Sequence, residues 1–124
     1  MKLLSCAGAL LALSLTSCTT DSTAPSDAER AATIEAEKTT AMNDYNNCVI
    51  EAARNLDDGN SDASLIALAV QPDCKDQFSR YVKISGTGMN SNAFAKYTET
   101  LENNQTQLTA GIIKRMRSQQ TRQN

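Results

Sequence analysis

Residues 42–56 read MNDYNNCVIEAARNL, and the organisation of the chain follows from this stretch. Its larger apolar residues recur at spacings of three and four positions: Met42, Tyr45, Val49, Ala52 and Leu56. That period is typical of a helix with one buried stripe. Cys48 stands beside the stripe, so we expect this cysteine to lie on or near the buried face.

Two local signals bound this helix. Upstream, Ser26 and Glu29 have the spacing of a capping box, in which the side chains of the first and fourth residues hydrogen-bond each other's backbone. Downstream, the run 57–59 (Asp-Asp-Gly) supplies a C-terminal glycine signal. We therefore predict one long helix from 26 to about 56. Its first half has only Ile34 as a large apolar residue and is predicted to be an exposed stalk or a docking surface.

The rest of the chain also reads as helices. A second helix is predicted from the cap Ser61 to Val70, and a third starts at Pro72, which suits a first helical turn, and runs to Ile84. The third has one apolar face, formed by Cys74, Phe78, Tyr81 and Val82. A loop at 85–92 precedes a last long helix, from 92 to about 119, with the stripe Phe94, Tyr97, Leu101, Leu108, Ile112 and Met116. The expected fold is all-α, a small bundle of two long and two short helices tied by one disulfide.

The N-terminus has the layout of an export signal. One lysine, Lys2, precedes an uncharged apolar segment over 3–15, which is shorter than the roughly 20 residues that span a bilayer. The run Leu15-Thr16-Ser17-Cys18 then resembles the lipobox of bacterial lipoprotein signal peptides. The resemblance implies removal of residues 1–17, acylation of Cys18 with chains such as palmitate, and anchoring to a membrane of the cell envelope. An ordinary secretory signal is the alternative.

The same resemblance also predicts the cellular location and the division of the chain into segments. Asp directly after the cysteine favours inner-membrane retention in such lipoproteins, and this chain has Thr19. The expected location is therefore the outer membrane facing the periplasm, with a Gram-positive surface as the alternative. Residues 18–25 would be a flexible tether, 26–120 the helical domain and 121–124 a disordered tail.

Two cysteines remain after processing, Cys48 and Cys74. An even pair in an oxidising compartment is usually a disulfide, and we predict that bond. Free buried thiols or a metal pair are the alternatives, and the chain has 0 histidines to complete a zinc site. Leu, Ile, Val and Phe make up about 15% of the chain after residue 17, below the roughly 20% at which disorder becomes a concern, although the low net charge argues the other way. The disulfide, a partner or self-association is expected to supply the missing stability.

Charge is divided between the two halves. Residues 18–73 carry a net charge of −8 and residues 74–124 a net charge of +5. We expect the first and last long helices to pack side by side, with the charges mostly paired between them. The apolar contacts would come from Tyr45, Val49, Leu101 and Leu108. The alternative is contact between an anionic surface, such as phospholipid phosphates, and the basic residues Lys114, Arg115, Arg117 and Arg122. The compartment and the acidic net charge argue against nucleic acid as a partner.

No catalytic pattern is present. The sequence lacks histidine, a nucleophile-elbow motif and a phosphate-binding loop, and the GxG at 86–88 reads as a plain turn. Asp57, Asp58 and Asp62 lack calcium-loop spacing and are interpreted as helix-end residues. We expect no cofactor and no metal. The sequence favours a non-catalytic envelope lipoprotein that binds an envelope protein or has a structural role. The alternative is an inhibitor or immunity lipoprotein against a cell-wall hydrolase or toxin, which would present the 57–62 turn.

Overall fold

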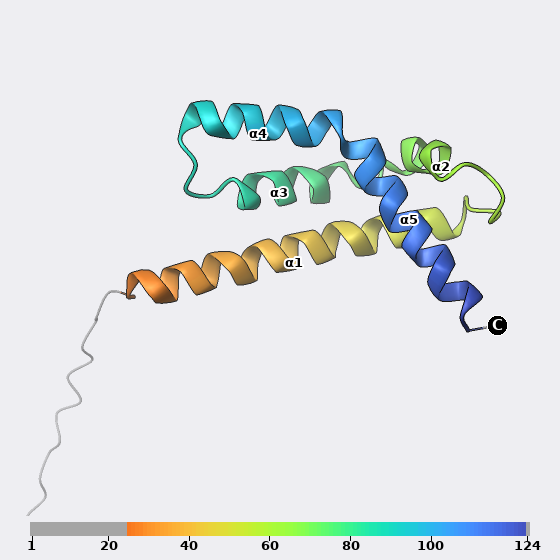
Figure 1. The fold of residues 1–124 in the computed structure, drawn as a ribbon, viewed down its shortest axis with the longest axis horizontal. Helices are drawn as coiled ribbons and strands as arrows, with labels where there is room; N and C mark the ends of the chain where they lie inside the picture. The colour runs from red at the N-terminus through yellow and green to blue at the C-terminus, as the bar shows by residue number, and fades with distance from the viewer. Residues whose placement is uncertain (1–24, 124) are drawn as a thin grey trace, which may run out of the picture.

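Five helices make up the part of the chain that the computed structural model describes, residues 25–123. They are α1 (Asp27–Arg54), α2 (Ala63–Val70), α3 (Lys75–Ser85), α4 (Ser91–Asn103) and α5 (Gln105–Thr121), as Figure 1 shows. The predicted all-α fold and small helical bundle are confirmed. Cys18 and the rest of residues 1–24 lie outside the described part.

Helix α1 begins as its sequence predicts. The Ser26 hydroxyl accepts a hydrogen bond from the Glu29 backbone N–H at 3.3 Å, and the Glu29 carboxylate accepts one from the Ser26 N–H at 2.7 Å. The capping box is therefore complete. No residue over 27–40 is buried, whereas Ala41, Tyr45, Val49 and Ala53 are.

The short helices begin slightly later than expected. Asp62, not Ser61, caps α2, because its carboxylate accepts a hydrogen bond from the Ser64 N–H at 2.7 Å. Pro72 lies in the turn between α2 and α3, and α3 starts at Lys75 with Cys74 as its N-cap residue. Both differences are shifts of a few residues, within the usual uncertainty of helix ends.

The expected last long helix is divided into two. The break is at Asn104, whose backbone N–H bonds to the carbonyls of both Thr100 and Leu101 at 3.2 Å. The Asn104 side-chain amide also donates to the Thr100 carbonyl at 2.7 Å. These bonds close the last turn of α4, and α5 leaves in a new direction (Figure 1). The sequence prediction of a continuous helix from 92 to 119 is corrected here.

The two halves of the chain pack differently from the prediction. Helix α1 packs mainly against α3, and α5 packs mainly against α2, while α5 crosses the C-terminal half of α1 (Figure 1). The first and last long helices therefore cross and do not lie along each other. The core lies at this crossing and includes Val49 from α1, Val70 from α2, Phe78 from α3 and Ile113 from α5.

Helix α4 is attached loosely. None of its residues is buried, although Leu101 packs against the edge of the core. The Phe94 ring lies against the buried Gly86, where a side chain would overlap it. Contact with Gly86 and the chain connection at Asn104 thus do much to hold α4 over α3.

Candidate functional site

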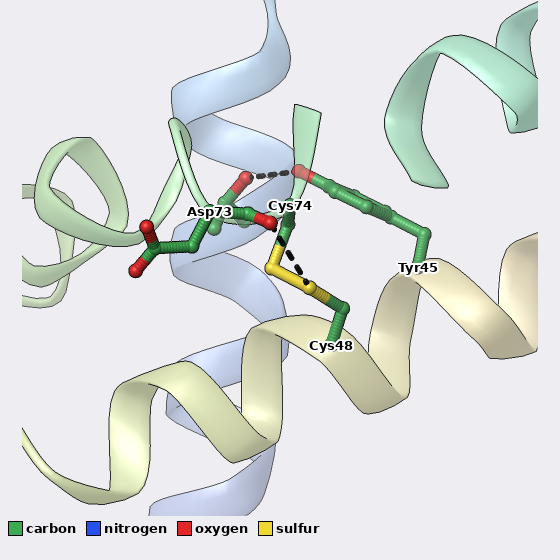
Figure 2. The surroundings of a disulfide bond; sticks show 5 residues. Tyr45, Cys48, Asp73 and Cys74 are labelled. Atoms are coloured by element: carbon green, nitrogen blue, oxygen red, sulfur yellow. Dashed lines mark hydrogen bonds between the residues drawn. A yellow bond between two sulfur atoms is a disulfide. The ribbon is translucent and has the colours of Figure 1, made fainter. Parts of the chain in front are cut away.

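The predicted disulfide is present and ties α1 to the start of α3. Cys48 Sγ and Cys74 Sγ are bonded at 2.08 Å, with 5.8 Å between the two Cα atoms. Cys74 is fully buried, and Cys48 is half-buried on α1. Figure 2 shows the bond beside the Tyr45 side chain. The closed loop contains the C-terminal turns of α1 and all of α2, so the bond limits how far α2 can separate from α1.

Next to the disulfide, Tyr45 joins three helices. Its ring centroid lies 5.2 Å from that of Phe78 on α3. Its hydroxyl lies 2.6 Å from Thr109 Oγ1 on α5, and both residues are fully buried. Because the single Thr109 hydroxyl hydrogen is donated to the Gln105 carbonyl at 2.8 Å, Tyr45 is the donor to Thr109. All the polar atoms of this link have partners, which makes it a structural link.

The 57–62 turn is held by its own carboxylates. The Asp57 carboxylate accepts hydrogen bonds from Arg117 Nε at 2.9 Å and Nη2 at 2.5 Å, and its side chain is only 4% exposed. Arg117 Nη2 also donates to the Ser61 carbonyl at 2.8 Å. The hydrogen bond from Arg117 is the main cause that lowers the pKa of Asp57. This pair fastens the turn to α5.

The other two aspartates of the turn bond to backbone N–H groups. Asp58 accepts from the N–H groups of Asn60 at 2.9 Å and Ser61 at 2.7 Å, and Asp62 caps α2. These backbone hydrogen bonds are the main causes that lower the pKa values of Asp58 and Asp62. Their role at helix ends agrees with the sequence interpretation. The turn is thus held by its own hydrogen bonds, while Asp58 and Asp62 stay exposed to solvent.

The four basic residues singled out from the sequence have different surroundings. Arg117 is bound to Asp57, so it is the one member of the set with a carboxylate within 4 Å in the described structure. Lys114, Arg115 and Arg122 are exposed on α5 and at its end. Charge pairing therefore links α5 to the turn after α1. Asp27 and Glu35, in the first half of α1, pair within the same helix, as in the Lys38–Glu35 pair at 2.8 Å.

The outward face of α2 is the most apolar exposed surface among the helices. Leu65 and Leu68 are 64% and 54% exposed, and Ala69 beside them is exposed too. Helix α2 has no charged residue, and its other face (Ala63, Ile66, Ala67 and Val70) is buried in the core. The sequence analysis predicted this helix but did not assign its exposed face. The signal was present: the eight-residue segment ASLIALAV is apolar on all sides, and a short surface helix buries only one side.

Within residues 25–123, no set of three or more acidic or sulfur side chains is arranged to hold a metal ion. None of the described helices combines the length and the apolar character needed to cross a bilayer. No protein-family model matches the chain, and neither the curated proteins nor the solved structures contain a match to it.

Proposed function

We propose that the chain is an exported, lipid-anchored envelope protein whose helical domain binds another envelope protein and carries out no catalysis. The observation that supports protein binding is the outward face of α2. Leu65 and Leu68 are spaced i, i+3 on a charge-free helix, and both are more than half exposed. Apolar anchors at this spacing are typical of a helix that inserts into an apolar groove.

A groove on a different protein fits this face better than a second copy of the chain. Specific stable interfaces bury about 800 Å² on each partner. Two leucines and one alanine supply only a fraction of that area, and a two-fold dimer would have to supply it from the same small patch on both sides. A concave partner can instead enclose each leucine, so that a small face is fully used.

Export is supported by the lipobox and by the disulfide. Protein disulfides persist in oxidising compartments, and Cys48–Cys74 is the bond expected there. Helix α1 starts at Asp27, so the eight residues from Cys18 to Pro25 would keep the start of α1 within about 25–30 Å of the membrane. Multiple acyl chains on Cys18 give stable anchoring. Thr19 makes the outer membrane the proposed location.

The anchoring is tested by intact mass spectrometry of the full chain extracted from membranes of a bacterial host. We expect loss of residues 1–17 and added acyl mass on Cys18. A Cys18→Ala variant is expected to be unprocessed or mislocalised. An unmodified, soluble product of the unaltered gene would contradict the proposal.

Protein binding is tested by a photo-reactive amino acid at position 69, beside the two leucines, in the anchored chain. We expect one cross-linked envelope protein whose yield falls at least fivefold in Leu65→Ser/Leu68→Ser. Met89→Ser is the matched control, because Met89 is 42% exposed but lies in the loop after α3. Equal cross-linking in all three chains, with unchanged helix content and acylation, would rule out this face as the binding surface.

A further inference from the structure

The two sulfur atoms of the Cys48–Cys74 disulfide differ in their access to solvent. Cys74 is 0% exposed and belongs to the core together with Val49 and Val70. Cys48 is half-buried and lines a surface groove of about 500 Å³ between α1 and α3, which Cys74 does not line. A molecule in solution therefore meets Cys48 before it can meet Cys74.

The surroundings of Cys48 in this groove are polar. Residues from α1 line it at spacings of three and four positions, on the side of the helix that carries Cys48: Asp44, Asn47, Glu51 and Asn55. The Asp73 carbonyl oxygen lies 3.9 Å from Cys48 Sγ, next to the bond (Figure 2). The groove therefore brings polar surface up to Cys48, where a small polar reagent can enter.

The ionisable residues that line the groove beside Cys48 are acidic. The carboxylate of Asp44 is paired with Arg80, whose Nη1 lies 2.9 Å away. Glu51 is exposed, and among residues 25–123 no cation lies within 4 Å of its carboxylate. Residues three apart on a helix have Cβ atoms about 5–6 Å apart, so Glu51 places negative charge close to Cys48.

We propose that Cys48 is the sulfur at which external thiols react with this disulfide, and that Glu51 makes cationic thiols react faster than anionic ones. In the reaction a thiolate RS⁻ attacks Cys48 Sγ and forms a new S–S bond to it. The Cys48–Cys74 bond breaks, and its electron pair leaves with Cys74 Sγ as a thiolate, which takes a proton from water. A second external thiolate attacks the R sulfur, which gives RSSR and releases Cys48 as a thiolate that is protonated in turn.

Formation of the bond follows the reverse path. Reduced Cys48, the accessible thiol, exchanges with an external disulfide, and Cys74 then attacks Cys48 Sγ and expels the external thiolate. Cys74 is the N-cap residue of α3, so a thiolate there lies at the positive end of an 11-residue helix. The partner that this site fits is a thiol or disulfide carried among neutral or basic residues, as on the surface of an oxidoreductase.

The first test identifies the sulfur that reacts. The full chain is prepared with Cys6→Ser and Cys18→Ser, so that Cys48 and Cys74 are its only cysteines, and is held in detergent micelles. It is treated briefly with 2-mercaptoethanol, quenched in acid, alkylated with N-ethylmaleimide and analysed by peptide mass spectrometry. We expect mercaptoethanol on Cys48 and maleimide on Cys74, in at least tenfold excess over the reverse arrangement. Equal amounts of the two products would overturn the proposal.

The second test asks whether the folded protein is the species that reacts. The rate at which 2-mercaptoethanol breaks the bond is measured at urea concentrations below the unfolding transition. We expect the rate to stay constant, because Cys48 is already accessible in the native state. A rate that rises in proportion to the unfolded fraction would mean that attack follows global unfolding, and the proposal would be wrong.

Two variants test the role of charge at low ionic strength. Glu51→Gln should accelerate reduction about twofold by 2-mercaptoethanol, whose thiolate has a charge of −1, and about fourfold by mercaptoacetate, whose thiolate form has a charge of −2. Cysteamine should react at an unchanged rate, because its ammonium group balances its thiolate. High salt should remove these differences.

The matched control is Glu99→Gln, since Glu99 is an exposed carboxylate on α4 that does not line the groove. This variant should react with all three thiols at the rates of the unaltered groove. The proposal is overturned if Glu51→Gln changes the three rates equally or not at all, or if Glu99→Gln has the same effect as Glu51→Gln.

Discussion

Tyr45 and Thr109, 64 residues apart in the chain, share a hydrogen bond of 2.6 Å between two fully buried side chains. Because Thr109 also donates to the Gln105 carbonyl, the bond has one direction, from tyrosine to threonine. It joins α1 to α5 at the crossing where the core lies. A buried polar pair of this kind is satisfied in only one register of the two helices, so it selects how they cross.

Substitutions at this pair should have unequal effects. Tyr45→Phe removes the donor while Thr109 keeps its bond to Gln105, and we expect a loss of about 1 kcal/mol in the free energy of unfolding. Thr109→Val leaves the Tyr45 hydroxyl buried without a partner, which should cost about 2–3 kcal/mol. The double variant should lose less than the sum of the two. Urea unfolding of the four proteins measures the coupling, and strict additivity would contradict it.

Two glycine substitutions should act in opposite directions. Gly111 lies within α5 with only the Arg115 guanidinium near its open side, so Gly111→Ala should raise the free energy of unfolding by about 0.5–1 kcal/mol. At Gly86 an added methyl overlaps the Phe94 ring. Gly86→Ala should cost about 1 kcal/mol, the lower end for overpacking, because the half-buried Phe94 can swing outward.

The mechanism at Gly86 is tested by adding Phe94→Ala. Without the Phe94 ring the methyl added at position 86 overlaps nothing. Gly86→Ala should then leave the free energy of unfolding unchanged. If Gly86→Ala destabilises equally in the presence and absence of the Phe94 ring, the steric explanation is wrong. The backbone is not the cause, since Gly86 has φ of −85°, which alanine also adopts.

Stability should fall in acid, in part through Asp57. Its pKa lies below the ordinary value of 3.8 in the folded protein, so the unfolded chain binds the proton first. The stabilisation is therefore complete above about pH 5 and is lost as the pH falls through the folded pKa. Asp57→Asn removes this part of the pH dependence. In urea titrations between pH 5 and pH 2, the variant's free energy of unfolding should fall less steeply than that of the unaltered protein. The part of the decrease that is due to Asp58 and Asp62 should remain. Parallel curves for the two proteins would exclude the Asp57–Arg117 pair as a source.

Removal of the disulfide should destabilise the domain strongly. Cys48 and Cys74 are 26 residues apart. In the chain-entropy model, a bond that closes such a loop restricts the unfolded chain and raises the free energy of unfolding by about 3.5 kcal/mol. Cys48→Ser/Cys74→Ser should lower the urea midpoint by a corresponding amount, and a reductant should have the same effect on the unaltered protein but none on the variant. A midpoint that does not change on reduction would show that the bond contributes no stability.

The sequence predicts the features that depend on local chemistry. The capping box at Ser26 and Glu29 and the Cys48–Cys74 pair each rest on side chains whose chemistry has few alternatives. The break at Asn104 was missed because no glycine or proline marks it. It follows from the core: Thr109, Ile113 and Met116 of α5 are buried at the crossing with α1 and α2, whereas the apolar residues of α4 lie against α3 and the core edge.

Local sequence patterns also do not predict which residues of the helices are buried and which are exposed. Periodicity places Leu56 on the same stripe as Tyr45, but α1 ends at Arg54 and Leu56 is 49% exposed. Ala41 and Ala53, which hydrophobicity ranks low, are fully buried instead. Arg115 and Arg117 are two residues apart in a basic run, yet only Arg117 has a carboxylate within 4 Å among residues 25–123. Their different surroundings depend on where α5 crosses α1, which no local pattern specifies.

Helix α4 has none of its residues buried, and this has a consequence for how the protein opens and how it can vary. Its amide hydrogens should exchange with solvent through a local opening that leaves the disulfide-bonded core intact, well before global unfolding. The outward positions of α4 are then nearly free of the folding constraint that fixes α1, α2 and α5. Natural selection can change the surface of α4 with little effect on stability, so this helix is the part of the molecule best able to diverge.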